Sequence, residues 1–137
     1  LLDLSNGECR LVCCDNIPWK LKQLGRAAKR LGFPAPPRAA ADMRSSPFSS
    51  PGIFDKVLID APCSNTGVLR RHPERKWRLT DADIRRMPAL QTALLNTAVD
   101  LVRPGGVLVY STCSIEREEG EDVIGNFLKK HPTFQPG

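Results

Sequence analysis

The chain has 137 residues, of which 41% are hydrophobic and 26% are charged, with a formal net charge of +5. These values are ordinary for one globular domain, long enough to bury a core without disulfides or metals. No apolar run reaches the length of a membrane span and no secretory signal pattern opens the chain, so we expect no membrane partner. The positive charge is a mild bias toward a polyanionic partner.

The cysteine pattern excludes two kinds of cross-linked protein. The number of cysteines is odd and no C-x-x-C pair occurs, so we expect neither a disulfide framework nor a zinc or other metal site. Free thiols in a chain without a signal indicate a reducing, cytoplasmic compartment. The five cysteines are Cys9, Cys13, Cys14, Cys63 and Cys113.

The first half of the chain predicts two strands around one helix. Apolar residues predict a strand over 10–15, and leucines and alanines at helical spacing predict a helix over 16–31. Gly32 and the prolines after it end that helix. Residues 38–42 form a weak strand candidate, and residues 44–54 are typical of a loop.

The second half of the chain predicts two more strands and two more helices. We expect a strand over 56–60, a long loop over 61–79 and a helix over 80–101, which opens on a capping box and is broken or restarted at Pro88. Residues 103–106 end that helix sharply. A strand over 107–110 and a helix capped by Ser114 follow, ending at Pro132.

This alternation of apolar strands with helices predicts an α/β fold in one domain over residues 1–137. The sheet should be Rossmann-like and mostly parallel, with helices on both faces. Asp15, Asp42 and Asp60 each close a predicted strand, and ligands of such sheets bind at the carboxyl ends of the strands. One such acid would more simply begin a loop. Three in succession favour a nucleoside-type cofactor.

The glycine-rich turn of such a cofactor site should lie about 20 residues before the acid. Counting back from Asp15 passes Leu1, the first residue. We therefore expect a domain truncated at its N-terminus, which lacks the first strand with its glycine loop, and which also lacks the final strands.

Two cysteines lie just beyond predicted strands, at the edge where active sites form in this sheet type. Free cysteine usually behaves as a small buried hydrophobe, which is how we interpret Cys9, Cys13 and Cys14. Cys63 and Cys113 fit that interpretation less well, because polar and turn residues flank both. The helix expected after Cys113 should lower its thiol pKa through the helix dipole.

A basic run follows the first of these cysteines. It contains Arg70, Arg71, His72, Arg75, Lys76, Trp77 and Arg78, against the single acid Glu74. Positive charge binds phosphates, and an aromatic or guanidinium plane can stack an unpaired base. A solvated surface loop is the simpler interpretation. The position directly after the cysteine favours contact with RNA.

Several of these motifs together resemble a known family. Asp60-Ala61-Pro62-Cys63-Ser64, Gly67, Arg70-Arg71-His72-Pro73 and Ser111-Thr112-Cys113-Ser114 strongly resemble the Sun-type RNA cytosine-5 methyltransferases, and most of all their bacterial small-subunit ribosomal RNA methyltransferase B branch. The resemblance runs from Leu1 to about Pro132. It implies a methyltransferase fold with S-adenosylmethionine as cofactor and RNA as substrate.

The resemblance also implies roles for individual residues. It implies that Cys113 is the nucleophile and that Cys63 assists product release, roles that spacing alone leaves open. It places Asp15, Asp42 and Asp60 in the cofactor site. The glycine-rich motif and the family's N-terminal RNA-binding region are missing, so we expect this chain alone to bind the cofactor weakly and to be inactive.

The chemistry of cytosine explains why a thiolate would be needed. Carbon 5 of the ring is a poor nucleophile, and a thiolate added to carbon 6 gives an enamine-like species that can attack an electrophilic methyl group. A base then removes the proton from carbon 5, and elimination frees the enzyme. Asp60 could hydrogen-bond the exocyclic amine of the base.

Three alternatives remain in view. An inactive Rossmann-like module that only binds RNA is favoured by the missing glycine loop and disfavoured by Cys63 and Cys113. DNA cytosine-5 methyltransferases usually carry the nucleophile at the Pro-Cys position and lack the Thr-Cys-Ser motif. A thiol hydrolase would need a histidine beside a cysteine, and the chain offers only His72 and His131.

Overall fold

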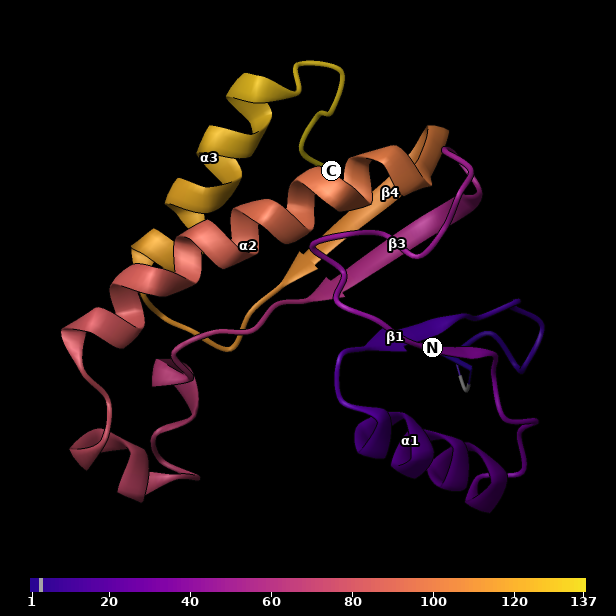
Figure 1. The fold of residues 1–137 in the computed structure, drawn as a ribbon, viewed down its shortest axis with the longest axis horizontal. Coiled ribbons are helices and arrows are strands. Elements are labelled where there is room, and N and C mark those ends of the chain that lie inside the picture. The colour runs from indigo at the N-terminus through magenta and orange to yellow at the C-terminus, as the bar shows by residue number, and fades with distance from the viewer. Residues whose placement is uncertain (3) are drawn as a thin grey trace. The chain divides into compact units, whose positions relative to one another are not determined.

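The structure is a computed structural model that describes residues 1–2 and 4–137, apart from the side chain at position 75. The chain divides into two compact units, residues 1–49 and residues 50–137. Strands and helices follow one another in the predicted order, and the strands pair in parallel (Figure 1). The predicted α/β class is therefore confirmed. Within the described residues, no helix combines the length and apolarity that crossing a membrane requires.

The first unit holds one pair of short strands and one helix. β1 (Cys13–Asp15) pairs in parallel with β2 (Arg38–Ala40), and α1 (Pro18–Arg30) connects them and packs on both. Both strands are shorter than predicted. Pro36 and Pro37 precede β2 and have no N–H group to donate, so the ladder can gain no donor from that side.

The second unit is built on a longer strand pair. β3 (Phe54–Asp60) pairs in parallel with β4 (Val102–Ser111), and the last pair joins Asp60 to Ser111. The register slips near the start of the ladder, so that residues 103–106 bulge out of β4. Gly105 allows this bulge with a left-handed φ of 74°. The predicted end of the preceding helix is confirmed, but the chain enters the strand at once instead of after Gly106.

The long helix α2 (Asp81–Leu101) begins as predicted and continues past its proline. The capping box is present, since the Thr80 hydroxyl accepts from the Asp83 N–H at 3.2 Å and the Asp83 carboxylate accepts from the Thr80 N–H at 3.1 Å. The predicted break at Pro88 is wrong. A proline removes one helical hydrogen bond, but the capping box fixes the turns before it, and buried Gln91 and Leu95 fix the turn after it.

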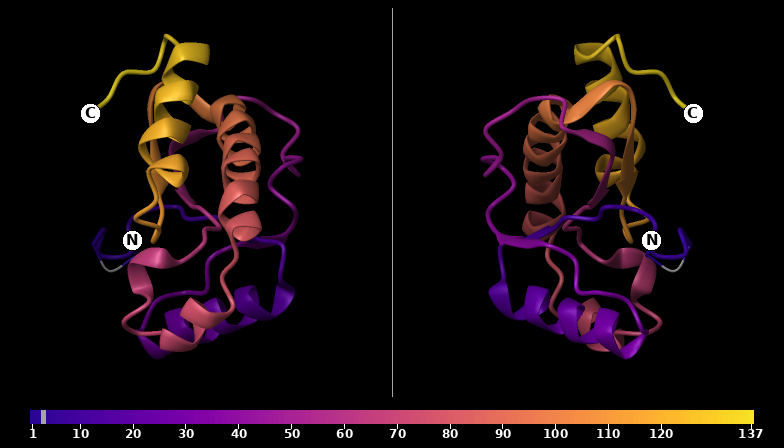
Figure 2. Two further views of the ribbon diagram at one scale, coloured as in Figure 1. Left: turned by 90° about the vertical axis from the view of Figure 1, so that its left-hand side faces the viewer. Right: turned by 90° about the vertical axis from the view of Figure 1, so that its right-hand side faces the viewer.

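The core of this unit lies between the helices and one face of the strand pair. Leu95 of α2 packs with Val123 and Phe127 of α3 (Glu121–Lys130), against Ile59 and Tyr110 of the strands. Figures 1 and 2 show α2 and α3 side by side along β3 and β4.

The opposite face of the same strands stays open in the described chain. Leu58 and Val107 are each 48% exposed and Val109 is 45% exposed. Both helices of this unit therefore cover one face of β3 and β4, and they fix the edge at which the two strands end together.

Candidate functional site

The two cysteine-bearing loops leave the sheet as neighbours. Beyond the last strand pair, the Ala61 N–H donates to the Ser111 carbonyl at 2.8 Å, and the Gly67 N–H donates to the Cys113 carbonyl at 3.0 Å. Main-chain pairing therefore continues past the ends of β3 and β4 into both loops. This pairing brings together Cys63 and Cys113, which lie 50 residues apart in the sequence.

The two sulfurs are in direct contact. Their separation is 2.8 Å, well beyond the roughly 2.05 Å of a disulfide bond. Both are free thiols, Cys113 exposed and Cys63 half-buried. The arrangement places two sulfurs together at the carboxyl edge of the strands.

Asn65 links both cysteines and was missed in the sequence. Its amide nitrogen donates to the Cys63 carbonyl at 2.9 Å, and its carbonyl oxygen lies 3.2 Å from the Cys113 sulfur, where it accepts the thiol proton. Asn65 has a left-handed φ of 63°, which asparagine tolerates better than most residues. A hydrogen-bond chain from Cys63 to Cys113 to Asn65 satisfies all three groups.

The thiol of Cys113 is protonated at neutral pH. Its pKa is raised to about 11, first by partial burial of the thiol although the residue as a whole is exposed, and then by the hydrogen bond and charge of Cys63. The prediction of a pKa lowered by a following helix is wrong. Only a short 3₁₀ turn, Arg117–Glu119, follows at first, and α3 begins at Glu121. Ser114 therefore does not cap α3.

A buried carboxylate lies beneath the two loops. Glu119 is 0% exposed, although an acid just before a helix ordinarily faces water. Its oxygens accept hydrogen bonds from the Ser64 N–H at 2.9 Å, the Gln91 amide at 3.0 Å and the Ser114 hydroxyl at 3.0 Å. One side chain thus joins the Cys63 loop, the Cys113 loop and α2.

The sequence did carry a signal for these buried polar residues. Glu119 precedes Val123 and Phe127 at intervals of four, so it continues the apolar stripe of α3 toward its N-terminus. Gln91 stands in the same relation to Leu95 in α2 and is also 0% exposed. Polar residues at core positions of a helical stripe mark buried hydrogen-bond networks.

The other cysteines behave differently. Cys13 and Cys14 are half-buried in β1, and burial is the main cause that raises the pKa of both thiols. Cys9 is exposed, contrary to its interpretation as a buried hydrophobe.

Two of the three predicted cofactor acids lie in the first unit. An Asp15 oxygen accepts from the Ile17 N–H at 2.7 Å, and the other lies 3.4 Å from Lys20. Asp42 pairs with the side chain of Arg44, whose hydrogen bonds lower the pKa of the carboxyl to about 2. A carboxylate has about four lone-pair positions, so Asp15 keeps capacity to accept hydroxyl groups, as a nucleoside-type cofactor requires. The contacts from Arg44 already occupy both oxygens of Asp42.

The third acid lies in the second unit. Asp60 is exposed at the end of β3, and its charge contributes to the raised pKa of Cys113. Its charge therefore acts on the Cys113 thiol.

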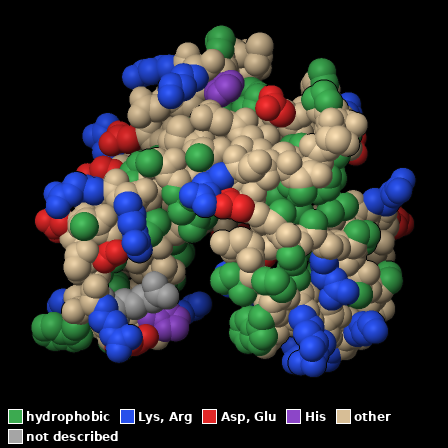
Figure 3. All heavy atoms as spheres, viewed as in Figure 1, with side chains coloured by type: hydrophobic (Ala, Val, Ile, Leu, Met, Phe, Trp, Pro, Cys, Tyr) green, Lys and Arg blue, Asp and Glu red, His purple; other side chains and the backbone are tan. Residues whose placement is uncertain are grey.

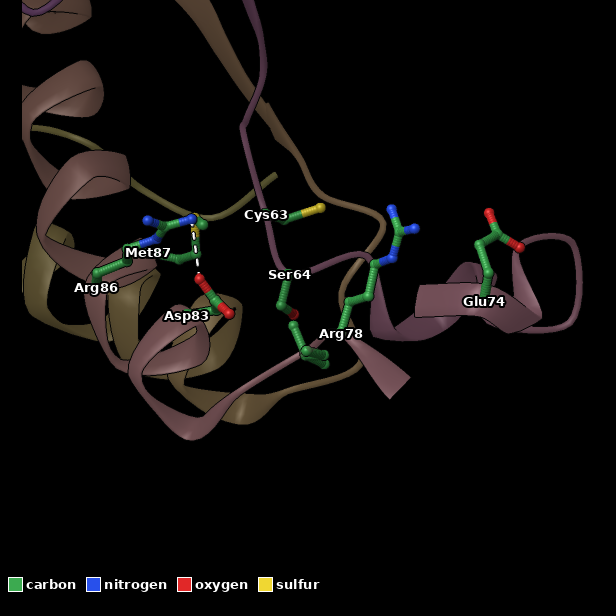
Figure 4. A pocket seen from close by; sticks show the side chains of 8 residues that line it. Cys63, Ser64, Glu74, Arg78, Asp83, Arg86 and Met87 are labelled. Atoms are coloured by element: carbon green, nitrogen blue, oxygen red, sulfur yellow. Dashed lines mark ion pairs between the residues drawn. The ribbon is translucent and has the colours of Figure 1, made fainter. Parts of the chain in front are cut away.

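A cavity of about 350 Å³ opens beside Cys63. In Figure 4 the Cys63 sulfur and the Arg78 guanidinium lie on the same side of the loop, and Arg86 forms an ion pair with Asp83 at 3.0 Å. Two arginines, two acids and a thiol at one cavity suit a polar ligand. The lining residues are Cys63, Ser64, Glu74, Arg78, Leu79, Asp83, Arg86 and Met87.

The basic run predicted to contact RNA lies on the surface. Part of it forms a short 3₁₀ helix, Pro73–Trp77, and another, Thr66–Val68, precedes it, where no regular structure was expected. Trp77 is 85% exposed, with the Lys76 amine 6.0 Å from its ring centre. Figure 3 shows Lys and Arg side chains gathered beside a histidine over this loop, at the lower left. The exposed members are Arg70, Arg71, His72, Lys76, Trp77 and Arg78; the Arg75 side chain lies outside the described residues.

The described part of the chain contains no group of three or more His, Cys, Asp or Glu side chains that could hold a metal ion. His72 lies 3.4 Å from Glu74, and His131 lies 3.2 Å from Asn96. The recorded partners of the two histidines are thus a glutamate and an asparagine, and not the cysteine that a thiol hydrolase would need.

Comparison with known proteins adds to this geometry. Residues 1–136 match the family described as 16S rRNA methyltransferase RsmB/F. The chain is 47% identical over 111 residues to ribosomal RNA small subunit methyltransferase B of Thermus thermophilus, covering 81% of this chain and 27% of that protein.

Two solved structures share the fold. The crystal structure of PH0851 has a TM-score of 0.91 at 38% identity, covering 96% of this chain and 30% of that one. NSun6 from Pyrococcus horikoshii, determined with SFG, has a TM-score of 0.82 at 30% identity, covering 93% of this chain and 32% of that one. The chain spans less than a third of the length of each of these relatives. It belongs to the RsmB/F family of 16S rRNA methyltransferases, and its Rossmann-like α/β fold is that of the Sun-type methyltransferases.

Proposed function

We propose that this chain forms the catalytic part of an enzyme that methylates carbon 5 of a cytosine in RNA, with ribosomal RNA as the substrate. The observation that carries the proposal is the 2.8 Å contact between the Cys63 and Cys113 sulfurs at the carboxyl edge of β3 and β4. Family membership supports methyl transfer to ribosomal RNA. The relative determined with SFG, an analogue of S-adenosylmethionine, supports that cofactor.

Cys113 acts as the nucleophile in this proposal. Its thiolate adds to carbon 6 of the cytosine, and the electrons of the ring double bond move to carbon 5, which takes the methyl group. Loss of the proton from carbon 5 then restores the double bond and expels the Cys113 thiolate. Because Cys113 is exposed, a cytosine ring can approach its sulfur.

Cys63 acts beside it. Because the pKa of Cys113 is about 11, the thiol must lose its proton before it attacks, and the Cys63 sulfur at 2.8 Å is within reach to take that proton once Cys63 has released its own to solvent. The same position lets Cys63 assist product release, when the bond between Cys113 and the base breaks.

The acids at the strand ends serve cofactor and base. S-adenosylmethionine, when bound, supplies an electrophilic methyl group. Asp15 would hold it through its remaining acceptor positions, and Asp42 would hold it by exchanging its contacts with Arg44 for hydroxyl groups of the cofactor. Asp60, exposed at the end of β3, would hydrogen-bond the exocyclic amine of cytosine.

The surface around Cys63 serves the RNA. Cations of the basic run would bind phosphates, and exposed Trp77 would stack an unpaired base. The cavity beside Cys63 is lined by this loop, which contributes Arg78, and by the start of α2, which contributes Arg86. We propose that this loop delivers the target nucleotide to the two sulfurs.

The test is covalent trapping in the full-length protein with an RNA that carries 5-fluorocytosine and with S-adenosylmethionine. Fluorine replaces the proton that must leave carbon 5, so elimination is blocked and the adduct persists on a denaturing gel. The adduct should form in the unaltered protein, in Cys63→Ala and in the exposed-cysteine control Cys9→Ala, and should be lost in Cys113→Ala. An adduct retained in Cys113→Ala would refute the proposal. RNA binding without any adduct would favour the inactive RNA-binding module instead.

A further inference from the structure

Glu119 holds a carboxylate in a place where ionised groups are rare. Its side chain is 0% exposed, and buried acids are uncommon unless their oxygens are fully hydrogen-bonded. The hydrogen bonds recorded for its carboxylate within the described residues come from a backbone N–H, an amide and a hydroxyl. No cation forms an ion pair with it in that part of the chain.

Glu119 and its partner Gln91 hydrogen-bond to the backbone on both sides of Cys63. The Ser64 N–H, directly after the cysteine, donates to Glu119 at 2.9 Å. The Pro62 carbonyl, directly before it, accepts from the Gln91 amide at 3.0 Å, and the same amide donates to Glu119 at 3.0 Å. The peptide groups that flank Cys63 are therefore both tied to one buried pair.

The same carboxylate reaches the residue after Cys113. The Ser114 hydroxyl donates to Glu119 at 3.0 Å and lies 3.2 Å from the Ser64 hydroxyl and 3.1 Å from the Thr66 hydroxyl. Hydroxyl groups of the two loops thus interlock around the acid.

The backbone of Glu119 is itself anchored to the sheet. Its carbonyl accepts from the Tyr110 hydroxyl at 2.8 Å, and Tyr110 belongs to β4. Glu119 therefore holds both cysteine-bearing loops in a fixed position relative to β4.

We propose that Glu119 is a positioning residue that sets the separation and direction of the Cys63 and Cys113 sulfurs without touching substrate. The expected effect of Glu119 on methyl transfer rests on the proposed function. Its effect on the placement of the two sulfurs does not. A carboxylate suits this task because both oxygens accept. An amide at position 119 would turn N–H groups toward the Ser114 hydroxyl, which now donates.

A polar network can also stabilise a fold without aligning anything, so the test must measure alignment. Glutathione disulfide oxidises the protein dithiol to a Cys63–Cys113 disulfide and is itself reduced to two glutathione thiols. The equilibrium constant of this exchange gives the effective concentration of one sulfur at the other. It depends on how the thiols are held, and it is measured by peptide mass after the free thiols are blocked.

The comparison uses the full-length protein, unaltered and as Glu119→Gln and Glu118→Gln. Glu118 is exposed and loses the same charge, which makes it a matched control. Glu119→Gln should lower the effective concentration about tenfold, and kcat for methyl transfer about 100-fold with little change in KM for RNA, as expected for misplaced reacting groups. Glu118→Gln should change neither.

The outcomes separate this inference from the proposed function. An unchanged disulfide equilibrium in folded Glu119→Gln overturns the positioning role, even if its melting temperature falls and even if Cys113 still forms the RNA adduct. A lowered equilibrium supports the role even if Cys113 forms no adduct, in which case only the proposed function fails. If Glu119→Gln does not fold, Ser114→Ala decides by the same measurement: a smaller loss supports the role, and no loss overturns it.

Discussion

The chain carries two pairs of cysteines that look alike in chemistry and differ in place. Cys13 and Cys14 lie inside β1, whereas Cys63 and Cys113 lie just past the ends of β3 and β4. The thiol pKa is raised in Cys13, Cys14 and Cys113, and burial is the leading cause in each. A raised pKa therefore does not distinguish a structural thiol from a reactive one. Position relative to the strand end does.

Strand geometry explains the difference. Successive side chains of a strand point to opposite faces, so Cys13 and Cys14 diverge although they are adjacent in sequence. Cys63 and Cys113 are 50 residues apart and converge to 2.8 Å, because parallel strands end side by side and each loop turns over the same edge. Convergence beyond the strand ends therefore brings two thiols within reach of a single ligand.

The difference between the two cysteine pairs is tested most strongly by removing one sulfur from each pair. In the full-length protein, Cys113→Ala should reduce the rate of methyl transfer by roughly 10⁶-fold, as loss of a covalent nucleophile does in other enzymes. Cys13→Ala should leave that rate unchanged. Transfer of radiolabelled methyl groups to RNA measures both. Equal losses in the two variants would erase the distinction between the pairs.

Alkylation without RNA should show the protonation state directly. The thiolate is the reactive form, so the rate at which iodoacetamide modifies Cys113 should rise about tenfold per pH unit until the pH approaches the pKa of about 11. Cys13 and Cys14 should stay protected while the protein is folded. Peptide masses over a pH series give the three rates. A plateau for Cys113 near neutral pH would contradict the raised pKa.

Removing the neighbour should have a smaller effect. Cys63→Ser should lower the pKa of Cys113, because the hydrogen bond and charge of Cys63 help to raise it. The pKa should remain above its ordinary value, since burial is the larger cause. The alkylation rate of Cys113 at mildly alkaline pH should therefore increase by up to about tenfold. An unchanged rate would show that the two sulfurs do not interact in solution.

The smallest expected effect is on stability at alkaline pH. The folded state keeps the Cys113 proton up to about pH 11, whereas the unfolded chain loses it near the ordinary thiol value of 9.0. The free energy of unfolding should therefore fall as pH rises between these values. In Cys113→Ser this fall should be shallower, although Cys13, Cys14 and Tyr110 contribute slopes of the same sign. Urea unfolding at several pH values compares the two proteins.

The sequence was enough to predict the order of elements and the edge where the cysteines lie. Apolar runs and helical spacing report on local structure, which is why the capping box at Thr80 was predicted correctly. The break at Pro88 and the start of β4 were predicted wrongly. Both depend on packing and register between segments, which local propensity does not contain.

The site was only partly predictable for the same reason. The contact of Cys63 with Cys113 follows from parallel pairing, but the role of Glu119 depends on which face of its turn meets the core. Acids at the start of a helix usually face water, and that rule failed here. The expected activation of Cys113 by a helix failed because a 3₁₀ turn intervenes before α3.

The main-chain hydrogen bonds that continue beyond the strands have a consequence for ligand binding. Because the Ala61 and Gly67 N–H groups already pair with the opposite loop, the conformational entropy of both loops is lost during folding. Little reorganisation is then left for the moment of encounter. In the proposed function, an arriving nucleotide would meet a preorganised pair of thiols, so its binding free energy would go into affinity and alignment and not into ordering the loops.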